Sequence, residues 1–432
     1  MTRLLALAAL ALAAPATLAQ ERVYIDVGAP NFRPLPIAVA PFPSEPEVRD
    51  AAATANAVLR NDLALSGLFD VLDPRGFLAD PSEGLTAPTI KFARWVDVGA
   101  EGLVKASVRR TPAGLEGDLR LFEVRSGREV LRAVQRVAAT EVRDLGHRFA
   151  DAVVEHYTRE PGVFRTKIVA IRRRGDLREL VLLDADGQNL RVLLSEKALL
   201  LLPAWRPDGR EILVTSYRGG RPELWVFRLA DSSFRRIATV GDAAMGGVYS
   251  PDGRKIAFVA SQGENSDVWV MDASGSNPRR LTRDPAIEVS PVWSPDGRRI
   301  AFVSARAGSP QIYVMNADGS EPRRLTFQGN YNQTPDWSPR GDLLAFTARD
   351  ERRAFDVFVL EMESGRIRRV TQDQGFTNEE PTWAPNGRLL AFVTDRGGKL
   401  ELVISDATGE RQTLVAPGSG ALSTPAWGPL VR

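Results

Sequence analysis

The stretch Trp293-Ser294-Pro295-Asp296-Gly297-Arg298, continued by Ile300-Ala301-Phe302-Val303, decides the fold because related stretches recur along the chain. Ser-Pro-Asp-Gly is typical of a tight turn, since Pro fixes the backbone at the second position and Gly accepts a positive φ. An aromatic residue opens each copy, and the copies are spaced by 44, 44, 44, 46 and 44 residues. These aromatic residues are Trp205, Tyr249, Trp293, Trp337, Trp383 and Trp427. A constant period of this length predicts a repeat architecture.

Each unit contains four short runs that are rich in β-branched and aromatic residues. In the unit that begins at Trp293, the later runs lie at residues 300–303, 312–315 and around 323–326. Turn residues separate the runs, which favours short antiparallel strands over helices. Four antiparallel strands repeated every 40–50 residues or so are typical of a propeller blade.

The two ends of the repeat array complement each other. Residues 164–195 supply three strands without an opening aromatic residue, whereas Trp427 belongs to a first strand that no further strand follows. We expect these two pieces to form one blade, which gives six blades in a closed ring. Closure of this kind hides sheet edges that would otherwise pair with other chains. We therefore predict an α/β N-terminal domain, residues 20–160, followed by an all-β six-bladed β-propeller, residues 161–432.

The region before the repeats has a mixed pattern of strands and helices. Strands are expected at residues 35–40, 103–109, 115–124 and 129–137, and helices at residues 48–65 and 140–157. Thr140 is a plausible N-cap for the second helix, because a hydroxyl group there can accept a bond from a free backbone N–H.

The first 19 residues match a secretory signal peptide. Arg3 supplies a positive start, residues 4–14 are apolar, and small residues precede the cleavage site expected after Ala19. Eleven apolar residues are too few to span a bilayer, which needs about 20. We expect the mature protein to act outside the cytoplasm.

The composition excludes several classes of function. Lys and Arg total 56 and Asp and Glu total 54, so no global field drives binding to nucleic acid or to a membrane surface. The chain has no Cys, which excludes disulfides, thiolate metal sites and thiol nucleophiles. Its two His, His147 and His156, are nine residues apart on one predicted helix and so face opposite sides. They cannot share a metal ion.

The sequence offers little for catalysis. No Gly-x-Ser-x-Gly motif is present, and both His lie outside the predicted ring. Regular carboxylates such as Asp252, Asp272 and Asp296 occupy turn positions, where they shape the backbone. We therefore expect no catalytic, cofactor-binding or metal-binding residues. A secreted propeller hydrolase or carbohydrate-binding module is the alternative.

Two repeated features are expected to be structural. The aromatic residues hold one fixed position in every unit, which favours a wedge between blades over a ladder of binding sites. Arg pairs recur in the fourth runs, where neighbouring residues face opposite sides of a strand, so a pair cannot form one patch. We expect these pairs to be solvated charges on the outer strands. They are Arg235-Arg236, Arg279-Arg280, Arg323-Arg324 and Arg368-Arg369.

The loops just before the aromatic residues vary more than the rest of the repeat. They connect the outermost strand of one blade to the innermost strand of the next, so they surround one mouth of the channel. Aromatic side chains among amides and carboxylates suit a protein partner, although ordinary rim loops remain the alternative. The candidate contact residues are Met245, Glu288, Tyr331, Asn332, Gln333, Phe376, Asn378 and Glu379.

A second candidate binding segment follows the signal peptide. Val23, Ile25 and Val27 alternate with Tyr24 and Asp26. A segment with this alternation can add as an edge strand to the sheet of a partner, or it can be a strand of its own domain.

Together these features resemble the TolB family of the Tol-Pal envelope system. The resemblance rests on the signal peptide, on residues 23–26 (VYID) and 33–39 (RPLPIAV), on the domain order and on the six repeats. It implies a non-enzymatic periplasmic adaptor that binds the lipoprotein Pal through one propeller mouth. It also implies that the N-terminal segment, Val23, Tyr24, Ile25, Asp26 and Val27, binds TolA of the inner-membrane complex.

The resemblance further implies a role in outer-membrane integrity and in invagination of the outer membrane during cell division. By position, the mouth loops match the Pal-binding face of the family. We expect a monomer without a cofactor, which does not bind nucleic acid and reaches the membrane only through its partners.

Overall fold

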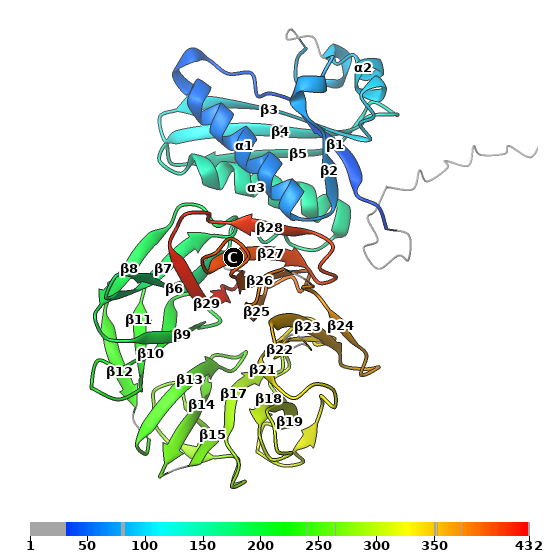
Figure 1. Cartoon of the computed structure of the whole chain (residues 1–432). Coiled ribbons are helices and arrows are strands. Elements are labelled where there is room, and N and C mark those ends of the chain that lie inside the picture. The colour runs from blue at the N-terminus through cyan, green and yellow to red at the C-terminus, as the bar shows by residue number, and fades with distance from the viewer. Residues whose placement is uncertain are drawn as a thin grey trace, which may run out of the picture.

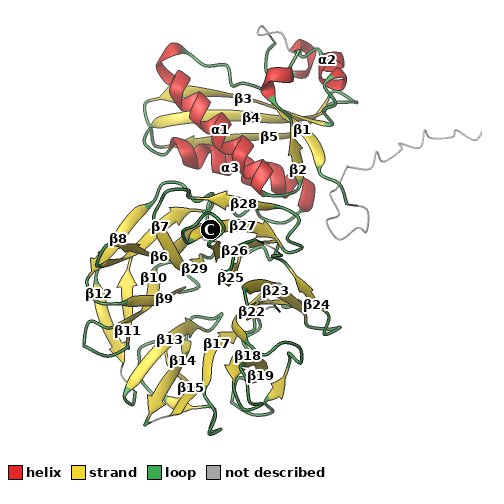
Figure 2. Ribbon diagram, in the orientation of Figure 1, coloured by secondary structure: helices red, strands yellow, loops and turns green. Residues whose placement is uncertain are grey.

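The computed structural model describes residues 32–78, 83–238, 240–263, 265–349, 351, 353–372 and 374–430. In this part of the chain an α/β domain is stacked on a β-propeller (Figure 1). All helices lie in the N-terminal domain, and the described part of the ring consists of strands and loops (Figure 2). This architecture confirms the predicted fold class. The predicted signal peptide lies outside the described residues.

A five-stranded sheet forms the centre of the N-terminal domain, with the order β2-β1-β3-β4-β5. Strand β1 pairs in parallel with β2 and β3, and the remaining pairs are antiparallel. The strands are β1 (Leu35–Val39), β2 (Phe69–Val71), β3 (Gly102–Thr111), β4 (Gly114–Glu123) and β5 (Arg128–Val137).

Helices cover both faces of this sheet. Helices α1 (Arg49–Leu65) and α3 (Val142–Thr158) contact each other and bury Leu59, Leu63 and Phe149 in one core. The short helix α2 (Phe92–Asp97) places Trp95 in a second, separate core. Short 3-10 helices occur at η1 (Pro46–Val48), η2 (Pro74–Gly76) and η3 (Ala87–Thr89).

The predicted N-cap of the second long helix is wrong. Helix α3 begins at Val142 after Glu141, which makes no capping bond with its side chain. The N–H of Glu141 donates to the carbonyl of Ala138 at 2.9 Å, so Thr140 lies inside a turn before the helix.

Six four-stranded sheets make up the ring. The first blade has the order β29-β6-β7-β8, from β29 (Ala421–Trp427), β6 (Lys167–Arg174), β7 (Leu177–Asp184) and β8 (Arg191–Glu196). Trp427 pairs with Ile168 in this sheet, which confirms that the two ends of the array share a blade.

The other five blades are each continuous in sequence. The second and third blades are β9 (Leu200–Trp205), β10 (Glu211–Ser216), β11 (Glu223–Arg228), β12 (Phe234–Ala238), and β13 (Ala243–Tyr249), β14 (Lys255–Gln262), β15 (Asn265–Asp272), β16 (Arg279–Arg280). The fourth, fifth and sixth blades are β17 (Glu288–Trp293), β18 (Arg299–Ser304), β19 (Gln311–Asn316), β20 (Arg323–Arg324); β21 (Asn332–Trp337), β22 (Leu343–Arg349), β23 (Phe355–Glu361), β24 (Ile367–Arg369); and β25 (Asn378–Trp383), β26 (Leu389–Thr394), β27 (Glu401–Asp406), β28 (Gln412–Val415).

The repeat Trp residues link neighbouring blades. The indole N–H of Trp293 donates to the carbonyl of Val248 in the preceding blade at 3.3 Å. Trp383 donates in the same way to Asp336 at 3.2 Å, and Trp205 donates to Ala426 at 3.0 Å. The expectation that these aromatic residues wedge between blades is confirmed at these positions.

The Arg pairs are not simply solvated charges on the outer strands, as was expected, because some of these Arg side chains pair with buried carboxylates. Arg280 forms an ion pair with the buried Asp267 at 2.5 Å, and Arg236 pairs with the buried Glu223 at 3.2 Å. The second Arg of these two pairs therefore compensates a buried carboxylate on the adjacent strand, in contrast to the solvated charge expected from the sequence.

Replacing Trp293 by Ala should destabilise the ring by about 3–5 kcal/mol, because it removes a buried aromatic side chain between blades. Chemical denaturation measures this loss. Phe376→Ala is the control, since that side chain is 74% exposed and its removal should cost less than about 0.5 kcal/mol. A loss below about 1 kcal/mol for Trp293→Ala contradicts the wedge role.

Candidate partner-binding mouth of the propeller

The loops that lead into the inner strands gather at one end of the ring. The inner strands β9, β13, β17, β21, β25 and β29 surround a central cavity of about 410 Å³. They all run in the same direction, so their first residues and the preceding loops meet at one mouth. The predicted contact residues come from this mouth, although their side chains differ in exposure.

Three large apolar side chains project from neighbouring loops of this mouth. Ile287, Phe327 and Phe376 are 56%, 73% and 74% exposed, and they precede β17, β21 and β25. Exposed apolar groups that gather on one face mark interaction sites, where aromatic anchors contribute much of the binding energy.

The loop that carries Phe376 is held by hydrogen bonds. The backbone N–H groups of Phe376 and Thr377 donate to Asp395 Oδ1 at 2.9 and 3.0 Å. The N–H of Phe355 donates to the carbonyl of Phe376 at 2.9 Å. Because these bonds fix the backbone, the loop itself loses little conformational freedom on binding.

Three predicted contact residues are buried. Glu288, Asn332 and Asn378 are 0%, 2% and 0% exposed, and each is the first residue of an inner strand. The Asn332 amide donates to Gln311 Oε1 at 2.8 Å, and the Asn378 amide donates to Asp356 Oδ1 at 3.1 Å. The expectation that these three side chains lie on the surface is wrong, and the two Asn side chains instead bond to the preceding blade.

Glu288 occupies the position in the fourth blade that Asn332 and Asn378 occupy in the fifth and sixth blades. It accepts a hydrogen bond from Ser304 Oγ at 3.0 Å and forms an ion pair with Arg306. The Arg306 guanidinium also lies over the Tyr313 ring, 5.0 Å from its centroid. Glu288 therefore fixes an Arg at the rim without being exposed itself.

The other predicted residues are half-buried. The Tyr331 ring lies edge-on to Phe355, with 5.7 Å between centroids, and the Arg349 guanidinium lies 4.8 Å from the Tyr331 centroid. Met245 lines the central cavity. Gln333 and Glu379 lie in inner strands β21 and β25, with part of each side chain accessible.

Phe327 was not among the contact residues predicted from the sequence. This residue follows Thr326, whereas Arg283 and Gln372 follow the equivalent Thr282 and Thr371. A single aromatic residue at a position that is otherwise polar was the signal that could have revealed it.

The wall of the cavity contains a second structural repeat. One residue in each inner strand has a positive φ, between 46° and 60°, at an irregularity in the strand pairing. These residues are Leu202, Gly246, Ser290, Thr334, Glu380 and Thr424. Pro follows five of them in the sequence. Such bulges bend a strand and change the direction of its side chains, and five of the six carry the strain of a non-glycine residue at positive φ.

Two carboxyl groups of the cavity wall link successive inner strands. Asp336 Oδ2 accepts from the N–H of Trp383 at 2.7 Å, and Glu380 Oε2 accepts from the N–H of Thr424 at 2.5 Å. Burial raises the pKa of Asp336 to about 6 and that of Glu380 to about 7, although these bonds oppose the shift.

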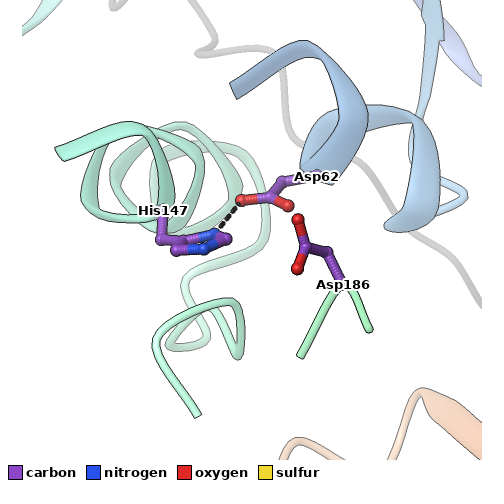
Figure 3. Close-up of side chains that lie close together, drawn as sticks. All are labelled: Asp62, His147 and Asp186. Carbon is purple, nitrogen blue, oxygen red and sulfur yellow. Dashed lines mark hydrogen bonds and ion pairs between the residues drawn. The ribbon is translucent and has the colours of Figure 1, made fainter. Parts of the chain in front are cut away.

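A group with the composition of a metal site lies away from this mouth. Among the described residues, Asp62, His147 and Asp186 bring potential ligand atoms within 4.8 Å of one another. They lie where the N-terminal domain meets the first blade (Figure 3).

Two family models together match most of the chain. A model described as the TolB amino-terminal domain matches residues 23–130, and one described as the TolB beta propeller domain matches residues 154–431. The chain belongs to the TolB family. The resemblance inferred from the sequence motifs is thereby confirmed.

Individual members of the family match either the full length of the chain or part of it. The chain is 66% identical over 429 residues to the Tol-Pal system protein TolB of Anaeromyxobacter sp. (strain K), with 99% of each chain covered. It is 46% identical over 199 residues to the Tol-Pal system protein TolB of Myxococcus xanthus (strain DK1622), with 46% of each covered. The crystal structure of TolB from Acinetobacter baumannii matches with a TM-score of 0.82 and 27% identity, over 92% of this chain and 97% of that chain.

These comparisons show a Tol-Pal system protein of the cell envelope that contains a propeller. In the described part of the chain, no helix has the length and hydropathy needed to cross a membrane.

Replacing Glu380 by Gln should stabilise the protein by about 1–2 kcal/mol at pH 8, since it removes a buried charge. The raised pKa makes ionisation in the folded state costly, so the gain should grow from pH 4.5 and level off above about pH 7. Thermal unfolding between pH 4.5 and 8 measures this gain, with the exposed Glu363→Gln as control. Equal gains at both ends of this range contradict the assignment.

Proposed function

We propose that this chain is a non-enzymatic periplasmic adaptor of the Tol-Pal system. In this proposal the propeller mouth binds the lipoprotein Pal, and the N-terminal segment binds TolA. The adaptor thereby supports outer-membrane integrity and invagination of the outer membrane during cell division. We place the domain boundary between residues 160 and 161, and we propose that the protein is a monomer.

One observation carries the Pal-binding part of the proposal. Ile287, Phe327 and Phe376 expose apolar surface on three neighbouring loops, at the mouth formed by the inner strands. Such side chains are costly to leave in water unless a partner covers them. We add Ile287 and Phe327 to the proposed contact set, and we remove the buried Glu288, Asn332 and Asn378.

The remaining contact residues have supporting roles. Met245, Tyr331, Gln333 and Glu379 keep part of their side chains accessible next to the exposed loops. Tyr331 lies between Phe355 and Arg349, which restricts its ring. We propose that these residues surround the apolar anchors and exclude water when the partner binds.

The TolA-binding part rests on the sequence pattern. Val23, Tyr24, Ile25, Asp26 and Val27 lie outside the described residues, and the first described strand, β1, starts only at Leu35. An alternating segment that precedes a folded domain suits addition to the sheet edge of a partner. The predicted signal peptide supports the periplasm as the location.

Phe376→Ala and Phe327→Ala should each weaken binding to the soluble domain of Pal by more than about 1 kcal/mol, or about fivefold, because each removes an apolar anchor. Titration calorimetry measures the affinity. Glu363→Gln is the matched control, since it changes an exposed side chain on the turn between β23 and β24.

Two results would contradict the proposal. Unchanged affinity in both Phe variants would place the Pal site elsewhere. No heat at tens of micromolar wild-type protein, together with turnover of a peptide or glycan substrate, would favour a hydrolase.

A further inference from the structure

Buried charged side chains gather where the N-terminal domain meets the first blade. Asp62 comes from α1, His147 from α3 and Asp186 from the turn after β7 (Figure 3). Asp184 is the last residue of β7. Their exposed fractions are 0%, 2%, 3% and 3%. Such a degree of burial is rare for charged groups unless they are paired.

His147 lies between carboxylates of the two domains. Its Nδ1 is 2.6 Å from Asp62 Oδ2 in the N-terminal domain, and its Nε2 is 3.5 Å from Asp184 Oδ2 in the propeller. A neutral imidazole has one N–H and can donate to only one of these carboxylates. A protonated imidazole has two N–H groups and can satisfy both.

The surrounding charges favour the protonated form. Arg143 of α3 pairs with Asp184 at 3.3 Å and also with Asp186, and Lys167 of β6 lies 2.6 Å from Asp184 Oδ1. Arg143 and Lys167 thus pair with the two propeller carboxylates, Asp184 and Asp186. The protonated His147 supplies the positive charge beside Asp62, which balances the cluster when Asp62 is ionised. An unbalanced buried charge is strongly destabilising.

Two other charged groups lie close to this cluster. Asp151 of α3 accepts a hydrogen bond from the N–H of Phe164 at 2.9 Å, and its charge also interacts with His147. Arg165, in the segment between α3 and β6, lies 3.5 Å from Asp144 and also interacts with Asp151. These two groups carry opposite charges and leave the balance unchanged.

We infer that the protonated His147 side chain bridges the two domains, and that loss of its proton loosens the contact between the N-terminal domain and the first blade. This inference concerns the junction between the domains and does not depend on the proposed partner sites.

The breakable contact lies on the propeller side. A side-chain carbon at Gly146 would lie 2.6 Å from Val58 Cβ, so α1 and α3 are in close contact. Asp62 and His147 are therefore held in one rigid pair of helices. The contact of His147 with Asp184 crosses from this pair of helices to the propeller, next to the apolar core that the two domains share.

The direction of the pH effect follows from the pKa of His147. Burial lowers this pKa, but the interactions with Asp184 and Asp62 outweigh it and raise the pKa from 6.5 to about 9. The stabilisation by the protonated imidazole is therefore lost as the pH rises through about 9. Burial raises the pKa of Asp62 to about 7, so below that pH Asp62 gains a proton and Asp184 remains the charged partner of His147. Burial opposes ionisation of Asp184, yet its bonds with His147 and Lys167 hold its pKa below the usual range, so Asp184 keeps its charge in acid.

A divalent metal ion is the other way to hold these carboxylates. Two observations argue against it: Arg143 and Lys167 already pair with Asp184, and His147 Nδ1 is occupied by Asp62. A metal would add two positive charges to a cluster that a single proton already balances.

Imidazole NMR tests the protonation directly. The chain has two His, so the variant His156→Gln leaves His147 as the only imidazole. Titration of the ¹⁵N-labelled variant between pH 5 and 10.5 should give a midpoint near 9. A midpoint at or below 6.5, the ordinary value, would overturn the inference.

Distance measurements test the effect on the junction. The chain has no Cys, so Ala113→Cys and Ala230→Cys allow one spin label in each domain. The distance distribution should broaden or shift between pH 7 and 10 in otherwise unchanged protein and in His156→Gln. His147→Gln should show the altered distribution already at pH 7 and no further change. Identical behaviour of His147→Gln and the unchanged protein at every pH would overturn the inference.

A titration with Zn²⁺ distinguishes a protonated His147 from a metal site. Calorimetry of the unmodified chain with Zn²⁺ should give no binding at micromolar concentration. Micromolar binding that His147→Gln abolishes would replace the proton bridge by a metal site.

Discussion

The pairing of β29 with β6 is the interaction on which the rest of the structure depends. Ala421 pairs with Arg173 at one end of this ladder, and Trp427 pairs with Ile168 at the other. The Trp427 indole donates to Thr166 Oγ1 at 2.8 Å, so the last repeat residue also contacts the segment that leaves the N-terminal domain. Without this strand the ring has two open sheet edges, and neither the cavity nor the mouth is complete.

Closure of the ring fixes the backbone around the mouth, where buried polar residues and exposed apolar residues have different roles. The buried polar side chains of Asn332 and Asn378 hold the first residues of β21 and β25 against the preceding blade. Apolar side chains such as Phe327 and Phe376 lie on the loops just before these strands and remain exposed. A rigid scaffold that presents variable apolar loops is well suited to bind another protein.

Much of the fold could be predicted from the sequence because it depends on a local pattern with a constant period. Trp427 is the last residue of that pattern, so the closure of the ring could be inferred from the spacing of the repeats alone. The burial of Asn332 and Asn378 could not be predicted from the sequence, because it depends on the residue at which each strand begins. A shift of one residue moves a side chain to the opposite face of the strand. The contact between His147 and Asp184 depends on how two domains meet, and no local pattern specifies that.

Thermal unfolding of a chain that ends at Gly420 tests the central claim most directly, when it is recorded with and without a synthetic peptide of residues 421–432. The account predicts a large fall in the melting temperature and a loss of cooperativity, because the first blade then lacks its inner strand. It also predicts that the added peptide restores much of both. A melting temperature unchanged by the truncation would contradict the claim that β29 holds the ring closed.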